Sequence, residues 1–258
     1  MRFDVVTLFS ELFAPFLTSG VTRRAYSSGL VDVKLWNPRD FADGSYRRVD
    51  DRPFGGGPGM VMLAEPLALC LEALRADRLA CGAGPAPTVL FSPVGEVLNH
   101  AGVERMAAGG SSGAALVCGR YEGLDQRFID THVDLQISLG DFVLSGGEIA
   151  AMALLDAVAR LQPGVLNDEA SHQMDSFNPA LDGLLDCPHY TRPEVWRGQP
   201  VPPNLMSGNH AQIERWRREQ RLALTDARRP ELVQAARSAG QLSQSDEAFL
   251  ADLPKSLE

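Results

Sequence analysis

Short apolar segments alternate with amphipathic segments from residue 3 to residue 161 of the chain. β-branched and apolar side chains predict strands at residues 3–9, 31–36, 88–91, 114–118 and 133–138. Apolar residues spaced three and four apart predict helices at residues 10–17, 21–28, 65–76, 98–108, 124–131 and 149–161, with Ser10 as the expected N-cap of the first. Strands that alternate with helices favour a sheet covered on both faces, so the expected fold class is α/β with a mostly parallel sheet.

Three successive strands are expected to end in glycine-bearing turns, at Gly95, Gly119 and Gly140. In open α/β sheets, ligands bind beyond the carboxyl ends of the strands, so these turns are expected to converge on one small molecule. Glycine has no Cβ and lets the backbone approach a ligand closely. We therefore interpret residues 117–148, which hold two of the three turns, as a cofactor site made mostly of main chain.

A long polar loop over residues 40–60 holds paired arginines, paired aspartates and a cluster of glycines. Loops of this length are usually either functional or disordered. The favoured interpretation is a loop that closes on a polyanionic substrate, and the alternative is a mobile linker.

The last third of the chain differs in character from the first part. Residues 162–177 are irregular and predict a flexible interdomain linker. Helices are predicted at 210–224, 230–239 and 245–253, which makes residues 178–258 a small all-α domain after a first domain of residues 1–161. The arginine-rich stretch at 215–229 is interpreted as a solvated helix face, with contact to an RNA backbone as the alternative.

Composition excludes several classes of protein. The four cysteines and five histidines are scattered without metal-ligand spacing, which predicts reduced thiols and no structural metal. No apolar run approaches the length of a membrane span and the first residues are typical of a strand, so no membrane partner is expected and the cytoplasm is the expected compartment. Neither a phosphate-binding loop with lysine nor a dinucleotide-binding glycine motif is present, which argues against kinases, ATPases and nicotinamide dehydrogenases.

Charge gives a mixed indication about nucleic acid. The net charge of -9 taken alone argues against a phosphate-rich partner. However, Lys34 and Lys255 are the only lysines among 24 basic residues, and arginine is well suited to bidentate contacts with phosphate and guanine.

Five motifs stand out along the chain: VDDRPFGGGPGM at 49–60, CGRYEG at 118–123, GDFVLSGGE at 140–148, LLDCPHYTRPEVW at 184–196 and SGNHAQIERWRR at 207–218. In this order they resemble the bacterial tRNA (guanine-N1)-methyltransferases, a family of the trefoil-knotted (SPOUT) methyltransferase superfamily. The resemblance implies a deep trefoil knot in which the turns after Ser92, Gly119 and Gly140 hold S-adenosylmethionine. It also implies a homodimer whose active site lies between subunits.

The activity implied is methyl transfer from S-adenosylmethionine to N1 of the guanosine on the 3′ side of the anticodon, position 37 of tRNA. The alternatives are a non-catalytic RNA-binding protein of the same fold and a methyltransferase that acts on another RNA. By the resemblance, Asp175 is the catalytic base and Arg160 stabilises charge that develops on the guanine. Local sequence alone would equally allow Asp175 to be an N-cap.

The resemblance also assigns binding residues. The expected cofactor residues are Pro93, Gly119, Tyr121, Glu122, Ser138, Leu139, Gly140, Asp141, Phe142, Val143, Leu144, Gly146 and Gly147. The expected substrate residues are Asp50, Gly55, Gly56, Gly57, Ser171, His210 and Arg217. Glu122 is either a turn residue or a group that orients the methionine end of the cofactor or a magnesium ion. Phe142 stands where many relatives have tyrosine, which removes one hydroxyl near the expected cofactor.

Overall fold

The computed structural model describes residues 1–108, 112–167 and 172–253. The chain divides into two compact units, residues 1–167 and residues 168–258. Each unit is described by itself.

The first unit is built on a five-stranded sheet in the order β2-β1-β6-β5-β7. The strands are β1 (Arg2–Val6), β2 (Asp32–Trp36), β5 (Thr88–Val97), β6 (Ala115–Val117) and β7 (Leu135–Ser138). Every neighbouring pair is parallel, with Asp4 opposite both Lys34 and Ala115 in the register of the first three strands. The expected α/β class with a parallel sheet is confirmed.

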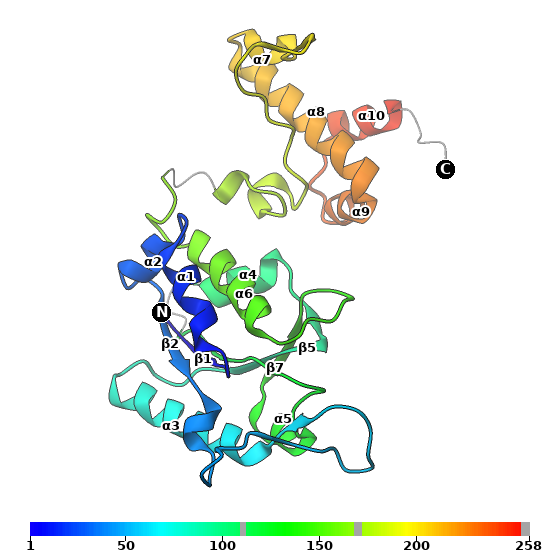
Figure 1. Ribbon diagram of the computed structural model, residues 1–258. Helices are drawn as coiled ribbons and strands as arrows, with labels where there is room; N and C mark the ends of the chain where they lie inside the picture. Colours follow the sequence, from blue (N-terminus) through cyan, green and yellow to red (C-terminus); the bar gives the residue numbers. More distant parts are fainter. Residues whose placement is uncertain (109–111, 168–171, 254–258) are drawn as a thin grey trace. The chain divides into compact units, whose positions relative to one another are not determined.

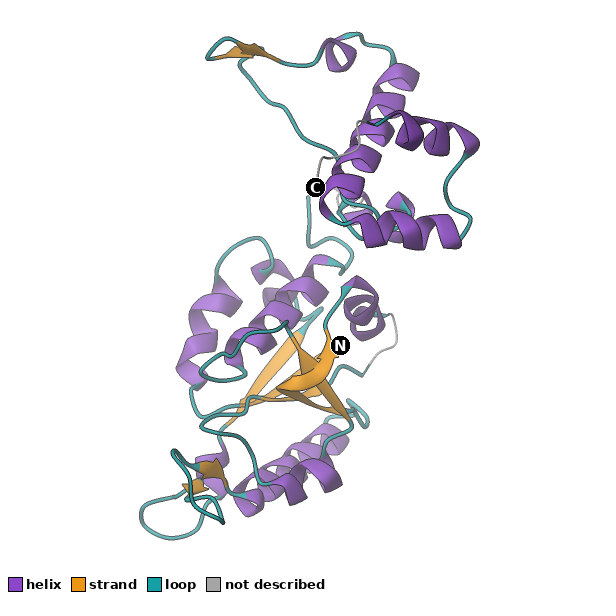
Figure 2. Cartoon of the chain, turned by 90° about the vertical axis from the view of Figure 1, so that its right-hand side faces the viewer, coloured by secondary structure: helices purple, strands orange, loops and turns teal. Residues whose placement is uncertain are grey.

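Helices cover both faces of this sheet (Figure 1, Figure 2). One face carries α1 (Phe13–Thr18), α2 (Arg23–Ser27), α4 (His100–Ala107) and α6 (Glu148–Arg160), and the other carries α3 (Ala64–Ala80) and α5 (Gln126–His132). Leu154 and Leu155 of α6 are fully buried in the first core, and Leu67 and Leu71 of α3 are buried in the second. Apolar spacing on each helix therefore fixes which side faces the sheet.

The first turn after β1 differs from the prediction. A 3₁₀ turn (Ser10–Leu12) precedes α1, and its N-cap is Phe9, with no side-chain capping bond from Ser10. The Oγ1 atom of Thr7 instead accepts a hydrogen bond from the backbone N–H of Phe9 at 3.0 Å. The expected N-cap at Ser10 is wrong because Ser10 lies inside the 3₁₀ turn, and Leu12 is the N-cap of α1.

Strand β5 also runs further than predicted, which changes the role of Gly95. Its pairing with β7 is interrupted between Phe91 and Glu96 and then resumes. Gly95 lies in this irregular part of the strand rather than in a terminal turn, and a Cβ there would come within 2.5 Å of the backbone of Gln136 and Ile137. Glycine is needed at 95 for close approach of two strands, so the turn predicted at this residue is wrong.

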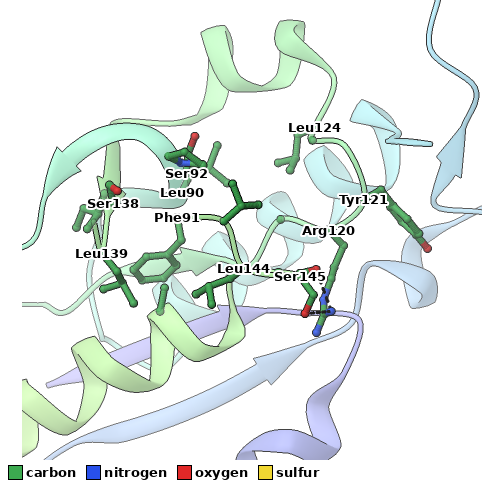
Figure 3. Close-up of a pocket in the computed structure, with 18 of the residues that line it drawn as sticks. Leu90, Phe91, Ser92, Arg120, Tyr121, Leu124, Ser138, Leu139, Leu144 and Ser145 are labelled. Atoms are coloured by element: carbon green, nitrogen blue, oxygen red, sulfur yellow. Dashed lines mark hydrogen bonds between the residues drawn. The ribbon is translucent and has the colours of Figure 1, made fainter. Parts of the chain in front are cut away.

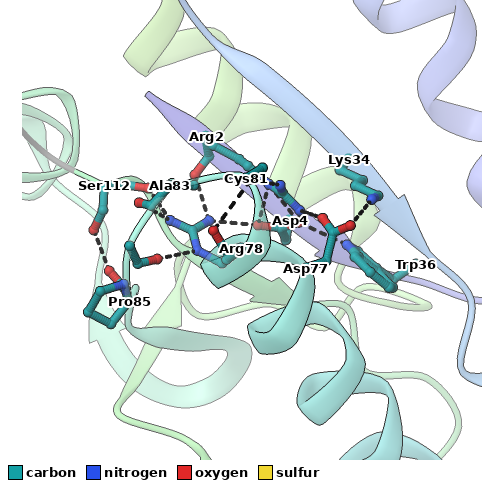
Figure 4. A network of polar contacts seen from close by, with 11 residues as sticks. Arg2, Asp4, Lys34, Trp36, Asp77, Arg78, Cys81, Ala83, Pro85 and Ser112 are labelled. Carbon is teal, nitrogen blue, oxygen red and sulfur yellow. Dashed lines mark hydrogen bonds and ion pairs between the residues drawn. The ribbon is translucent and has the colours of Figure 1, made fainter.

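A network of charged residues holds the amino-terminal edge of the sheet (Figure 4). The buried carboxylate of Asp4 accepts hydrogen bonds from Arg78 at 2.6 Å, from Trp36 at 2.8 Å and from Arg2 at 3.1 Å. Arg2 also donates to Asp77, near the end of α3. A fully buried carboxylate with several donors is stable in such a position. The network therefore has a structural role and joins β1 to α3.

The long loop at 40–60 contains short elements of its own. A 3₁₀ turn (Pro38–Phe41) overlaps its start, and β3 (Asp50–Asp51) pairs antiparallel with β4 (Val61–Met62). The glycine-rich part of the loop therefore spans the interval between these two paired strands.

The second unit is mainly helical, but it also contains a short β-hairpin, which the prediction of an all-α domain did not include. It contains 3₁₀ turns at His172–Met174 and Pro179–Leu181 and the helices α7 (Pro203–Met206), α8 (His210–Arg228), α9 (Pro230–Ser238) and α10 (Gln244–Asp252). Leu222 and Val233 lie in its core. A small hairpin of β8 (Val195–Trp196) and β9 (Gln199–Pro200) follows a long loop and directly precedes α7 (Figure 2).

Arg218 of α8 ties the second unit together. Its guanidinium donates to Asp182 at 2.7 Å and to both carboxylate oxygens of Asp246 at 3.1 to 3.2 Å. Asp246 in turn forms a capping box with Ser243 at the start of α10. Of the helices in the described ranges, none is long and apolar enough to cross a membrane.

Candidate functional site

A cavity of about 220 Å³ lies beyond the carboxyl ends of β6 and β7, beside the interrupted middle part of β5 (Figure 3). Its predicted lining residues are Pro93, Gly119, Tyr121, Glu122, Ser138, Leu139, Phe142, Val143, Leu144, Gly146 and Gly147. It is also lined by residues outside that prediction, namely Leu90, Phe91, Ser92, Arg120, Gly123, Leu124, Ile129, Ile137, Ser145 and Ala150. The structure thus brings together all of the predicted cofactor residues except Gly140 and Asp141.

Gly140 does not line the cavity, but its backbone shapes the loop that does. Its φ of 146° lies in a region that residues with a Cβ rarely adopt. Its backbone N–H donates to the Oγ of Ser138 at 3.1 Å, and the backbone N–H of Phe142 donates to its carbonyl oxygen at 2.9 Å. These bonds set the direction in which the loop leaves β7, so Phe142 and the residues after it reach the cavity.

Gly146 and Gly147 bring that loop back against the end of β6. The N–H of Gly147 donates to the carbonyl oxygen of Gly119 at 3.0 Å, and Arg120 and Gly146 form an antiparallel bridge. A Cβ at Gly147 would lie 2.8 Å from the Cα of Cys118. At these two positions glycine is therefore needed for close approach of the loop backbone to the end of β6.

Arg120 and Glu148 form an ion pair at the wall of the cavity. The Nη2 of Arg120 lies 3.0 Å from the Oε2 of Glu148, whose side chain is 1% exposed. Burial, and then the nearby carboxylate of Glu148, raise the pKa of the Cys118 thiol well above its ordinary value. Sequence reasoning did not single out this pair, although a charged residue directly after a buried strand is the signal that could have found Arg120.

Tyr121 lies between the turn that follows β6 and the predicted substrate loop. Its φ of 61° is left-handed, an uncommon conformation for a residue with a side chain. Burial, followed by the charge of Asp50 and a hydrogen bond to it, raises the pKa of the Tyr121 hydroxyl, and Arg39 opposes that shift. Asp50 is therefore a neighbour of the Tyr121 hydroxyl, on the β3 side of the site.

Glu122 and the end of the glycine-rich loop are also in contact. The backbone N–H of Glu122 donates to Met60 at 3.0 Å, and that of Met62 donates to Gly123 at 2.9 Å. A Cβ at Gly59 would come within 2.4 Å of the Oε1 of Glu122, so the Glu122 side chain lies against the loop backbone. Both turn and ligand-orienting roles for Glu122 fit this position.

Gly55, Gly56 and Gly57 occupy the outer part of the same loop. All three have positive φ, and a Cβ at any of them would meet no atom within 4 Å. Their requirement for glycine is therefore conformational, with open space around each.

The two predicted catalytic residues belong to different units. Arg160 is the last residue of α6 in the first unit, and Asp175 follows the 3₁₀ turn His172–Met174 in the second. The N-cap of the next turn is Asn178, whose side chain accepts from Ala180, so the capping role considered for Asp175 is filled by another residue. Ser171, a predicted substrate residue, lies outside the described residues.

Two of the predicted substrate residues, His210 and Arg217, lie on α8. His210 is its exposed first residue, with Asn209 as the N-cap. Arg217 lines a second cavity of about 550 Å³, together with Trp216, Tyr190 and Arg192. Arg217 is 43% exposed and pairs with Glu214 at 2.7 Å, so it is at the surface without being buried in a structural network.

Metal-ligating side chains are dispersed in the part of the chain that the structure describes. In the ranges 1–108, 112–167 and 172–253, no group of three or more acidic, histidine or cysteine residues could hold a metal ion. The four cysteines are free thiols, with Cys81 exposed and the others buried.

Comparison with known proteins gives a consistent result over nearly the whole chain. The family model described as tRNA (Guanine-1)-methyltransferase TrmD matches residues 1–235. A Polaromonas sp. (strain JS666) protein is 82% identical over 253 residues, covering 98% of this chain and 97% of its own length. A Paracidovorax citrulli protein is 73% identical, with 98% of each chain covered, and a Bordetella pertussis protein is 58% identical, also with 98% of each covered. All three are named tRNA (guanine-N(1)-)-methyltransferase. The chain therefore belongs to the tRNA (guanine-1)-methyltransferase TrmD family.

Proposed function

We propose that this chain transfers a methyl group from S-adenosylmethionine to N1 of the guanosine on the 3′ side of the anticodon in tRNA. The observation that supports this most strongly is the cavity at the carboxyl ends of β6 and β7 and beside the middle of β5, because the family's glycine-containing motifs at 118–123 and 140–148 line it. Its position is the one at which open α/β sheets bind ligands. A tRNA substrate would place the enzyme in the cytoplasm.

The lining of the cavity fits the cofactor. Leu139, Phe142 and Leu144 supply apolar surface for an adenine ring, and the turns at Gly119 and Gly146 bring backbone close to the cavity. Gly140 supports this arrangement through a conformation that only glycine adopts readily. When bound, S-adenosylmethionine supplies an electrophilic methyl group.

The chemistry at the guanine calls for a base and a cation. Guanine N1 carries a proton at neutral pH, so its lone pair becomes nucleophilic as that proton leaves. We assign the role of proton acceptor to the carboxylate of Asp175, and we assign to Arg160 the stabilisation of negative charge that develops on O6. A well-placed base accelerates such a step by roughly 10² to 10⁴.

Glu122 would orient the amino-acid end of the cofactor, either directly or through a magnesium ion. Its contact with the loop that ends at Met60 supports a place at the boundary between cofactor and substrate. Methyl transfer measured with magnesium and with a chelator, for wild type and for Glu122→Gln, separates the two roles. A chelator effect that disappears in the variant assigns the ion to Glu122, whereas equal activity with and without the chelator assigns direct orientation.

The RNA would contact both units. In the first unit we assign contacts to Asp50 and to the loop that contains Gly55, Gly56 and Gly57, because the open positive-φ backbone of this loop can approach a ligand closely. In the second unit we assign contacts to Ser171, His210 and Arg217. The exposed position of His210 and Arg217 on α8 supports this assignment.

We also propose a homodimer with the active site between subunits, and the trefoil knot that the family implies. The exposed apolar side chains of Phe9, Leu12 and Ile149 in the first unit support an interface on that surface. The hydrogen bond from Gly147 to Gly119 supports a loop that returns through the neighbouring turn, as a knot requires.

The test of the activity is single-turnover transfer of a labelled methyl group to a tRNA transcript with guanosine 3′ of the anticodon. A transcript with adenosine at that position and an Asp175→Asn enzyme are measured beside it. Transfer to the guanosine transcript alone, lost in the variant, supports both substrate and base. Cofactor binding without transfer would favour the non-catalytic alternative or another RNA, and undiminished transfer by the variant would remove Asp175 from the mechanism.

The shared active site has its own test by complementation. Asp175→Asn and Arg160→Ala chains are co-expressed with different affinity tags, and the mixed dimers are purified. If Asp175 of one subunit acts with Arg160 of the other, a purified mixed dimer has one intact site of two and recovers about half of wild-type activity. Activity no higher than that of either variant alone would place both residues in one subunit.

A further inference from the structure

A buried carboxylate joins three elements at the carboxyl edge of the sheet. Glu148 is the first residue of α6 and is 1% exposed. Its Oε1 accepts hydrogen bonds from the Oγ1 of Thr7 at 2.8 Å and from the Nε of Arg120 at 3.1 Å. Thr7 follows β1 and Arg120 follows β6, and these strands are paired neighbours. One side chain therefore connects the ends of two strands with the helix that follows the cofactor loop.

The guanidinium of Arg120 is held from several directions. Its Nη1 donates to the carbonyl oxygen of Ser145 at 3.0 Å, a bond visible in Figure 3. Its Cζ lies 4.3 Å from the centre of the Phe9 ring, which contributes a cation–π contact. A Cβ at Gly146 would come within 2.3 Å of the Arg120 Nε, so glycine lets the guanidinium pass close to the loop backbone. Arg120 is oriented by contacts with the protein on each of these sides.

Two roles for such an arginine at a cofactor cavity can be distinguished by charge. A cation available to a ligand would attract the carboxylate of the cofactor, and a counter-charge in the protein would weaken that attraction. A cation that is already paired would instead hold the loop, and removal of its counter-charge would loosen the wall of the cavity. In this structure the hydrogen bond and ion pair with Glu148 and the hydrogen bond to Ser145 all match the second role.

We infer that Glu148 is a positioning residue for cofactor binding: it fixes Arg120, and Arg120 fixes the Ser145–Gly147 wall of the cavity. This inference rests on the proposed binding of S-adenosylmethionine. The cofactor need not touch Glu148, because the carboxylate acts through the guanidinium. The hydroxyl of Thr7 has a supporting role, since it orients the carboxylate from the end of β1.

The test measures binding of S-adenosylhomocysteine to the full chain by calorimetry, well below the melting temperature and without RNA. Glu148→Gln keeps the shape of the side chain and removes its charge. We expect the dissociation constant to rise about tenfold or more, since displacement of a site wall by about 1 Å has effects of this order. Unchanged or tighter binding would overturn the inference, and tighter binding would mean that the carboxylate restrains an arginine that serves the ligand.

Asp4→Asn is the matched control for a general loss of stability. Asp4 is also a buried carboxylate with two arginine partners, and it lies on β1 at the opposite edge of the same sheet (Figure 4). Both variants are expected to lower the melting temperature, but only Glu148→Gln is expected to weaken binding. Equal weakening by Asp4→Asn would show that Glu148 acts through stability alone and would overturn the inference.

A second pair of variants keeps the test decisive if Glu148→Gln does not fold. Thr7→Val removes the hydroxyl and keeps the branched shape, whereas Thr7→Ser keeps the hydroxyl. We expect weaker binding in Thr7→Val and near wild-type binding in Thr7→Ser, and no difference between them would contradict the inference. If the wild-type chain itself fails to bind S-adenosylhomocysteine, the proposed function fails instead, so the two failures are distinguishable.

Discussion

The side chain of Ser138 and the backbone of Gly140 form a closed pair of hydrogen bonds at the end of β7. The Oγ accepts from the Gly140 N–H at 3.1 Å and donates to the Gly140 carbonyl oxygen at 3.2 Å. The two residues are thereby held in a tight turn directly before the loop that lines the cavity. Ser138 thus shapes the loop in addition to lining the site.

The conformation of Gly140 leads to the first prediction. Gly140→Ala would place a Cβ at a φ of 146° and 3.2 Å from the Phe142 ring, so the loop must shift. We expect a loss of S-adenosylmethionine affinity of about tenfold or more, and a still larger loss for Gly140→Val. Equilibrium binding of the cofactor, with circular dichroism as a check on the fold, measures the effect.

Gly29→Ala is the control for this substitution. Gly29 has a φ of 74° with no atom near its Cβ position, and it lies between α2 and β2, outside the cavity lining. Alanine there is expected to cost about 1 kcal/mol of unfolding free energy and to leave cofactor affinity unchanged. Normal affinity in Gly140→Ala would show that this turn does not shape the site.

Local patterns predicted the elements of this fold better than they predicted how those elements meet. Apolar periodicity located α6 almost to the residue, because an amphipathic helix carries its own signal. Gly95 was misplaced because its glycine requirement comes from the backbone of β7, which is distant in sequence. Glu148 was overlooked for the same reason, since its partners Thr7 and Arg120 meet it only after the strands pair.

In the candidate site, too, local sequence predicted some residues, and the others could be identified only from the folded structure. The predicted cofactor residues between 138 and 147, which leave out Ser145, come from one short stretch of sequence, and most of them line one cavity. Leu90, Phe91 and Ile129 also line it, but apolar residues in strands and helices look alike whether they face a core or a ligand. The sequence motif therefore identified the loop residues of the site. The apolar residues that line the rest of the cavity could be identified only from the folded sheet and its helices.

Strand spacing at Gly95 gives a prediction about stability. Gly95→Ala would force a Cβ into the backbone of Gln136 and Ile137, where neither atom is the end of a flexible side chain. We expect a loss of about 2–4 kcal/mol of unfolding free energy. We also expect weaker cofactor binding, because Ser138, which lines the cavity, follows Ile137 directly in β7. Chemical denaturation of the full chain measures the first effect. Gly102→Ala in α4, where the nearest atom would be 3.5 Å away, is the control and is expected to be close to neutral or stabilising.

The arginines of α8 give a prediction about RNA. Arg217→Glu is expected to weaken tRNA binding by about tenfold and to reduce the slope of log affinity against log salt by about 0.7–0.9 for each phosphate that is no longer neutralised. Arg215→Glu is the matched control, because Arg215 lies on the same helix, is 80% exposed and also pairs with a glutamate, Glu219. Equal effects of the two substitutions on tRNA binding would indicate a general charge effect. If neither substitution changes tRNA binding, the arginines of α8 form a solvated helix face.

Arg218, the neighbour of Arg217 on α8, is unsuitable for testing RNA binding. Its guanidinium holds Asp182 and Asp246, so charge reversal would break the structure of the second unit. Weaker RNA binding in such a variant would therefore have two causes that the measurement could not separate.

The pairing of Asp246 with Arg218 gives a prediction about pH. Although burial opposes the shift, hydrogen bonds from Arg218 and Ser243 lower the pKa of Asp246 below its ordinary value of 3.8. The native state therefore favours the ionised carboxylate, and this contribution to stability is present above pH 3.8 and is lost as the pH falls through the lower pKa of the folded protein. Asp246→Asn is expected to lose about 1–3 kcal/mol of unfolding free energy at pH 7. Scanning calorimetry of the full chain should show the gap between wild type and variant closing below pH 3.8. Asp226→Asn, at an exposed position on α8, is the control. If the difference in stability between wild type and Asp246→Asn stays unchanged to the lowest pH, the loss of stability in Asp246→Asn comes from packing rather than from charge.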